Sequence, residues 1–167
     1  GLKKLSEFVN NDYKNEEYLW SVILNIASES PAKYYFIIQS LKGKIPTGFL
    51  GITYLDMCNA AAIEQSTFKH PFNTENGFAF LEKTVNNSGP EEESYIISVT
   101  TSIPFLAKAY QERLFDLVGN HKSADVRIEA AWAGAKTGND KAIGKLVDYS
   151  KDYRYSSKAT DYLRELE

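Results

Sequence analysis

The sequence predicts an all-α fold built from roughly eight or nine short helices. Apolar residues recur at the i, i+3, i+4, i+7 spacing of an amphipathic helix along most of the chain. Polar breaks containing Gly, Pro or Asn separate these apolar stripes. No segment combines apolar/polar alternation over a strand length with a hairpin turn. At 167 residues, the chain is long enough to bury a core without a disulfide.

The first third of the chain predicts three helices. The first covers residues 16–28, with Asn15 as a candidate N-cap. The second starts at Pro31 and stops at Gly43, although part of it is also rich enough in β-branched and aromatic residues for a strand. The third opens at Pro46–Gly48 and carries the apolar stripe Leu50, Tyr54, Leu55, Cys58, Ala61 and Ala62.

The middle third predicts three more helices after a loop over residues 66–76. Thr74 is a candidate N-cap for a helix over 75–86, which the break at 86–90 terminates. Pro90 and the three glutamates that follow it mark a new helix start. That helix should end near Ser102, before Pro104, and a further helix should stop at Gly119–Asn120. The last part of the chain predicts helices over 124–136, 141–151 and 155–165.

The segment from Asp125 to Ile143 resembles the bacterial HEAT-type helical repeat. In that repeat, Asp, Val and Arg open the second helix of a pair, small alanines follow, and a Gly–Asn turn leads to Ala–Ile in the next helix; this order matches DVRIEAAWAGAKTGNDKAI. Gly138 suits the left-handed residue that ends a helix, and Asn139 or Asp140 can cap the next one. The match departs from the pattern at Gly134, where Leu is expected, and at Trp132, which occupies a normally polar position.

The resemblance is clearest over residues 123–163 and implies a short right-handed α-solenoid of antiparallel helix pairs. A repeat of roughly 40 residues would allow about four pairs, with weaker units upstream, so we expect residues 1–167 to form a single repeat domain. An irregular helical bundle is the alternative fold. Solenoids expose one extended surface, so the expected function is a non-enzymatic protein-interaction or scaffold module of a bacterial protein.

Two alternative functions come from other functional classes, a toxin-neutralising protein and an enzyme. An immunity-type protein that neutralises a basic toxin would fit the middle third, where residues 59–119 hold 4 basic and 8 acidic side chains. DNA glycosylases built from HEAT-like repeats need a basic face for duplex phosphates, and the net charge of −3 argues against that class and against nucleic acid as a partner.

No catalytic, cofactor-binding or metal-binding residue is predicted. The chain has a single cysteine and two histidines far apart, so no multi-Cys zinc site or His pair arises. Candidate contacts with a protein partner are instead the aromatic residues that lie off the apolar stripes or in the breaks. These are Trp20, Phe68, Phe72, Trp132, Tyr153 and Tyr155. For Trp132, packing against an extra N-terminal helix or a capping segment is the equally open alternative.

Other polar residues are expected to have structural roles. The run Glu91–Glu93 should complement a helix dipole, and His121 should do the same at a helix C-terminus. His70, next to a proline, is expected as a turn element, and Cys58 as a buried, inert thiol. For the remaining charged pair of the HEAT-like segment, Asp125 and Arg127, a bridge between neighbouring repeats is expected rather than a phosphate contact.

No apolar run is long enough to span a bilayer, and no signal-peptide pattern opens the sequence. We therefore expect a soluble protein, without membrane association and with the cytoplasm favoured. Whether Gly1 and Leu166–Glu167 are native ends is left open, as are the partner's identity and the oligomeric state.

Overall fold

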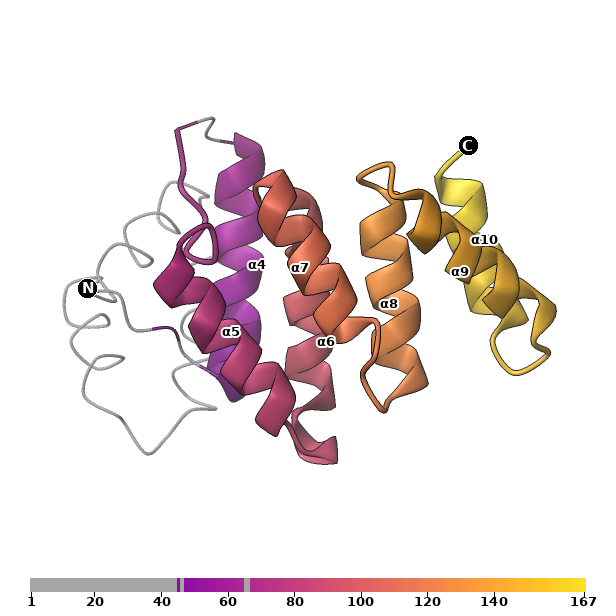
Figure 1. Cartoon of the computed structure of the whole chain (residues 1–167), viewed down its shortest axis with the longest axis horizontal. Coiled ribbons are helices and arrows are strands. Elements are labelled where there is room, and N and C mark those ends of the chain that lie inside the picture. Colours follow the sequence, from indigo (N-terminus) through magenta and orange to yellow (C-terminus); the bar gives the residue numbers. More distant parts are fainter. Residues whose placement is uncertain (1–44, 46, 65–66) are drawn as a thin grey trace. The chain divides into compact units, whose positions relative to one another are not determined.

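The computed structural model describes residue 45, residues 47–64 and residues 67–167. Seven α-helices and two short 3-10 helices make up the regular structure of this part of the chain, which contains no strand. The all-α prediction is therefore confirmed for the residues described (Figure 1). The chain divides into two compact units between Pro71 and Phe72. The helices predicted over 16–28 and from Pro31 to Gly43, together with Trp20, lie outside the described residues.

In the first unit, helix α4 covers Gly48–Glu64. It begins where the sequence predicts: Gly48 has a left-handed φ of 63°, and Gly51 N–H donates to Thr47 O at 3.0 Å. The predicted stripe is buried at Tyr54, Leu55, Cys58 and Ala61, while the side chain of Leu50 lies outside the described part. Burial raises the pKa of the Cys58 thiol, which keeps it protonated and unreactive as expected.

His70, in the segment after α4, is more than the turn element that the sequence predicts. Its side chain is buried, and Nε2 lies 3.2 Å from Asn59 Oδ1 on α4. The ring of Phe68 meets the imidazole edge-on, with 6.4 Å between the ring centroids. Burial lowers the pKa of His70 to about 3, so the imidazole is neutral in the fold.

The second unit consists of six α-helices whose positions agree with the sequence predictions to within about two residues. They are α5 (Glu75–Asn87), α6 (Glu93–Thr101), α7 (Lys108–Val118), α8 (Ala124–Ala135), α9 (Asp140–Lys151) and α10 (Ser156–Glu165), with the 3-10 helices η1 (Pro90–Glu92) and η2 (Ile103–Phe105).

Side-chain caps explain where several of these helices begin. Thr74 Oγ1 accepts a hydrogen bond from Gly77 N at 3.1 Å, and Ser123 Oγ accepts one from Val126 N at 3.4 Å. Asn139, rather than Asp140, caps α9: its Oδ1 accepts from Lys141 N at 3.0 Å and from Ala142 N at 3.3 Å. Gly138 has the predicted left-handed conformation, with φ 77°.

The acidic run between α5 and α6 stabilises a helix start. Glu92 Oε2 accepts from Gly89 N at 3.1 Å, and Glu93 lies in the first turn of α6. Among the described residues, no group of three His, Cys, Asp or Glu is placed to hold a metal ion. Glu92 and Glu93 thus stabilise the starts of η1 and α6.

Helix α8 is the centre of the second unit. It contacts α6, α7, α9 and α10, and Figure 1 shows it between the α6–α7 and α9–α10 pairs. The buried alanines and Gly134 let neighbouring helix backbones approach α8 closely, because small side chains leave no bulky groups between them. The residues of α8 that are buried are Val126, Ile128, Glu129, Ala130, Ala131, Ala133, Gly134 and Ala135.

Candidate functional site

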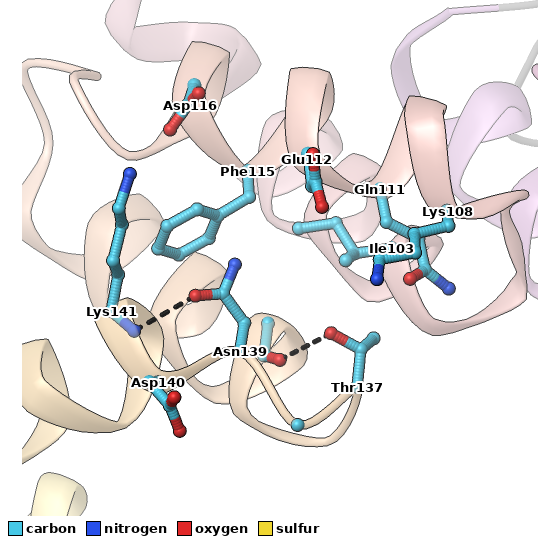
Figure 2. Close-up of a pocket in the computed structure, with 12 residues that line it drawn as sticks. Ile103, Lys108, Gln111, Glu112, Phe115, Asp116, Thr137, Asn139, Asp140 and Lys141 are labelled. Carbon is cyan, nitrogen blue, oxygen red and sulfur yellow. Dashed lines mark hydrogen bonds between the residues drawn. The ribbon is translucent and has the colours of Figure 1, made fainter.

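A cleft of about 440 Å³ lies between α7 and the turn that joins α8 to α9 (Figure 2). Its walls come from two stretches of sequence, residues 108–116 of α7 and residues 137–141 of the turn and the start of α9. The residues that line it are Ile103, Lys108, Gln111, Glu112, Phe115, Asp116, Gly134, Thr137, Gly138, Asn139, Asp140 and Lys141.

The floor of the cleft is apolar and tightly packed. Ile103 is fully buried, and Phe115 is only 3% exposed. A Cβ atom at Gly134 would lie 2.9 Å from both Phe115 Cδ2 and Ala142 Cβ, so the absent side chain lets the Phe115 ring reach this depth. On the other side, Lys145 Nζ lies 5.1 Å from the Phe115 ring centroid and donates to Gly119 O at 3.4 Å.

The α7 wall follows from helical spacing. Lys108, Glu112 and Asp116 are four residues apart, so they lie along one face of the helix and are all exposed. Gln111 Nε2 on the same wall donates to Leu106 O at 2.8 Å, which fixes the start of α7 against the preceding segment.

The opposite wall is rigid because its turn is hydrogen-bonded to itself. Thr137 Oγ1 donates to Gly134 O at 2.7 Å, and Asn139 N donates to the same carbonyl at 3.3 Å. With the Asn139 cap on α9, these bonds fix the backbone from which Asp140 and Lys141 project (Figure 2).

The rim of the cleft gathers exposed charges of both signs, although among the described residues Lys83, Glu91, Glu93 and Glu165 elsewhere in this unit also form no ion pair. Lys108, Glu112, Asp116, Asp140 and Lys141 are exposed, and within the described part of the chain none of these five forms an ion pair. Other charges of this unit do form pairs, for example Arg113 with Glu75 and Glu82, Arg154 with Asp152, and Lys158 with Glu129. The cleft thus combines an apolar floor with a rim of three unpaired carboxylates and two unpaired ammonium groups.

The chain matches no family model, no curated protein and no solved structure. What the cleft does must therefore be inferred from its own chemistry. In the residues that the structure describes, no helix combines the length and apolar character needed to cross a membrane.

Trp132, the aromatic contact candidate in the HEAT-like segment, packs against helix α10. Its ring stacks on that of Tyr162 with 4.7 Å between centroids, and Lys136 Nζ lies 3.3 Å from the centroid of the indole. Of the two predicted alternatives, the structure places Trp132 in a packed position, half-buried between α8 and α10, rather than as an exposed anchor. Burial also lowers the pKa of the Lys136 ammonium group.

A polar contact continues this packing along α8. Tyr162 Oη donates to Glu129 Oε1 at 2.5 Å, and Lys158 Nζ lies 2.8 Å from the same oxygen and 3.6 Å from Asp125 Oδ1. Burial and the hydrogen bond to Glu129 raise the pKa of Tyr162. For Lys158, burial alone would lower the pKa, but the bond with Glu129 raises it overall.

The other contact candidates are scattered, and none of them lines the cleft. Phe72 is fully buried, so it cannot serve as a free contact; a large ring in a short break is more stable when removed from water. Phe68 and Tyr155 are half-buried, and Tyr155 meets Tyr149 edge-on at 5.8 Å. Tyr153, in the α9–α10 turn, is 90% exposed.

The structural roles expected for the charged residues of α8 agree with the contacts. Arg127 Nη1 donates to His121 O at 2.6 Å and to Lys122 O at 2.9 Å, while Nε donates to Tyr149 Oη at 3.2 Å. It thereby joins the α7–α8 turn to α9. Asp125 faces Lys158 of α10, so both residues connect neighbouring helices.

His121 differs from its prediction as a dipole-complementing cation. Its Nδ1 accepts from Ser123 N at 3.2 Å, so the proton of the neutral ring is on Nε2, which lies 3.2 Å from Ser88 Oγ. Burial lowers its pKa, as do nearby Lys122 and Arg127, while Glu93 opposes them. In its neutral form, His121 links two connections by hydrogen bonds: it contacts Ser88 in the α5–η1 connection and Ser123 in the α7–α8 connection.

The rim residues were not predicted as partner contacts, because the predicted contacts were all aromatic residues. A signal for three of the five rim residues is present: Lys108, Glu112 and Asp116 form a polar stripe at helical spacing. Nothing in the sequence indicates that this stripe faces residues 137–141, because that depends on how α7 packs against α8.

Proposed function

We propose that the chain is a HEAT-like α-solenoid that acts as a protein-interaction module, and that the cleft beside α7 is where it contacts its partner. The observation that carries the proposal is that charges of both signs gather around one cleft. Five charged side chains of both signs surround a preformed cleft, and in the described part of the chain they have no ionic partner of their own.

The packing of the second unit supports the solenoid part of the proposal. Besides contacts between sequential helices, α5 contacts α7, α6 contacts α8, and α8 contacts α10. Contacts between each helix and the next but one are the pattern expected when helix pairs stack in a repeat array. The Arg127 and Asp125 bridges fit the same arrangement.

The rim favours a protein partner over a small ligand. Carboxylates and ammonium groups at one cleft require a ligand that presents both charges at set spacings, and a polypeptide does this readily. The packed floor offers little apolar surface to a drug-sized molecule, which usually needs a mostly apolar pocket. A scaffold role follows if the partner is one of several.

The acidic majority at the rim keeps the immunity-type function as a second candidate. Three carboxylates face two ammonium groups there, and the middle of the chain has a net negative charge. A single stable basic partner would favour the neutralising protein, whereas several weaker partners would favour the scaffold.

The test is co-purification from cells that naturally make the protein. The variant Glu112→Lys/Asp116→Lys reverses two charges on the α7 wall; Glu64→Lys/Glu165→Lys makes the same charge change at exposed positions outside the cleft. We expect quantitative mass spectrometry to find a protein that the wild type and the control recover equally and the cleft variant recovers at least tenfold less. The absence of any protein with this dependence would contradict the proposal.

A further inference from the structure

The arrangement of charges around the cleft restricts the kind of segment that can bind there. In Figure 2, Lys108 and Lys141 lie at opposite ends of the lining; Glu112 and Asp116 lie between them on the α7 wall, and Asp140 lies on the opposite wall. From Lys108 along the α7 wall to Lys141 the order of charges is therefore positive, negative and positive, and Asp140 lies at the Lys141 end (Figure 2).

The spacing along α7 matches that of an extended chain. Lys108 and Glu112 are four helical residues apart, which is about 6 Å along the helix axis. In an extended peptide, residues i and i+2 point to the same side and are about 6.6 Å apart. When the central side chain of such a peptide lies between Glu112 and Asp116, the side chains two positions away on either side point toward Lys108 and, beyond Asp116, toward Lys141 (Figure 2).

Resting on the proposed function, we infer that the cleft binds an extended segment of a protein partner with a Lys or Arg at its centre and an acidic residue two positions away on each side. The central cation faces Glu112 and Asp116, and the two carboxylates face Lys108 and Lys141. The self-bonded turn at Thr137–Asn139 holds the opposite wall in place, so binding requires no rearrangement of the backbone there.

The charges of the rim also predict what the cleft rejects. A segment with the reversed order, acidic at the centre and basic on both sides, would place like charges together at the two α7 carboxylates and at both lysines. A uniformly basic segment would match the carboxylates but meet Lys108 and Lys141 at both ends. Selection therefore depends on the order of charges and not on net charge.

An NMR titration of the full chain tests this inference. The probe is the capped synthetic peptide Ser-Glu-Thr-Lys-Thr-Glu-Ser, and the control is the charge-reversed peptide Ser-Lys-Thr-Glu-Thr-Lys-Ser. We expect saturable shifts of backbone amides in residues 108–116 and 137–141 with the probe, at least fivefold weaker binding of the control peptide, and weaker binding of the probe at high salt. In the Glu112→Lys variant the probe should lose at least fivefold in affinity, whereas the exposed Glu165→Lys variant should bind it as the wild type does.

Equal binding of the two peptides, or no saturable shift in the cleft at millimolar probe, would overturn the inference. If the probe fails but the cleft variant still loses a partner in cells, the interaction function stands and the charge order is wrong. If both experiments fail, the cleft is not an interaction site.

Discussion

Gly134 is the residue at which one methyl group should disturb the second unit most clearly. Its helical position would tolerate alanine, but an added Cβ would be 2.9 Å from Phe115 and from Ala142. We expect Gly134→Ala to lower the free energy of unfolding by about 1–3 kcal/mol, because neighbours packed this closely have to move. Chemical denaturation of the variant measures this loss.

Gly144 in α9 is the matched control for this substitution. It is exposed, and a Cβ there would meet no atom within 4 Å. Gly144→Ala should therefore stabilise the protein by about 0.5–1 kcal/mol through helix propensity alone. Equal effects of the two substitutions would contradict the packing described around Gly134.

A pH dependence is expected from His70. Its pKa is about 3 in the fold and near 6.5 in the unfolded chain, so the unfolded state binds the proton more readily as the pH falls. The stability that depends on neutral His70 is present above about pH 6.5 and is lost progressively as the pH falls toward 3. Between these pH values the unfolded state binds one more proton than the folded state. The free energy of unfolding therefore falls by about 1.4 kcal/mol for each unit by which the pH decreases.

Urea unfolding at a series of pH values measures the slope of the unfolding free energy against pH. Between pH 6 and pH 4, His70→Gln should reduce this slope by the amount that one bound proton contributes. This holds whatever effect the substitution has on stability at pH 7. Lys69→Gln, at the exposed neighbouring position, should retain the wild-type slope. An unchanged slope in His70→Gln would show that His70 is not held neutral.

For single residues, the sequence did not predict the tertiary contacts that explain their roles. The departure of Gly134 from the repeat pattern is visible in the sequence, but its reason, the ring of Phe115, is 19 positions away. For His121, the neighbouring helix end suggested a cation, whereas the fold supplies a hydrogen-bond donor to Nδ1 and an oxygen facing Nε2, an environment that a neutral ring satisfies.

At the scale of elements, the position of α10 depends on its contacts with α8. Ala159 is its one fully buried residue, while Tyr162 stacks on Trp132 and bonds to Glu129. Tyr162→Ala should therefore lower the free energy of unfolding by about 2 kcal/mol and expose Trp132 to water. Tyr153→Ala, whose ring is 90% exposed, should change neither.

Tryptophan fluorescence in a Trp20→Phe background detects this exposure, because Trp132 is then the single tryptophan. The Tyr162→Ala emission should shift to the red, and Tyr162→Phe, which keeps the ring, should shift less. Emission unaffected by Tyr162→Ala would mean that α10 does not cover Trp132.

The positions of the helices were predictable because their ends are determined locally. Thr74 and Asn139 cap the helices that the sequence assigns to them, and Gly138 adopts the left-handed turn. Which helices touch was not predictable in the same way. The contact between Trp132 and Tyr162 joins residues 30 positions apart, and it depends on the angle at which α10 returns to α8.

At the scale of the whole molecule, the candidate site is a property of packing rather than of any motif. Its walls belong to α7 and to the α8–α9 turn, which meet because α8 lies between neighbours on several sides. The sequence predicts each wall as a helix or a turn and contains the charges of both. It does not show that the charges surround one cleft, so the six predicted aromatic contact residues were the better candidates from sequence alone, although none of the five that the structure describes lines it.

The central claim is that this cleft contacts a protein partner, and site-specific photo-crosslinking tests it most directly. A photoreactive amino acid would replace Glu112 or Lys141 in the cleft or, as a control, the exposed Glu165 on α10, in the full chain within cells that naturally make the protein. We expect a discrete adduct with one or a few proteins from position 112, the same adduct from position 141, and none of it from position 165. Adducts absent from both cleft positions, or formed equally at position 165, would contradict it.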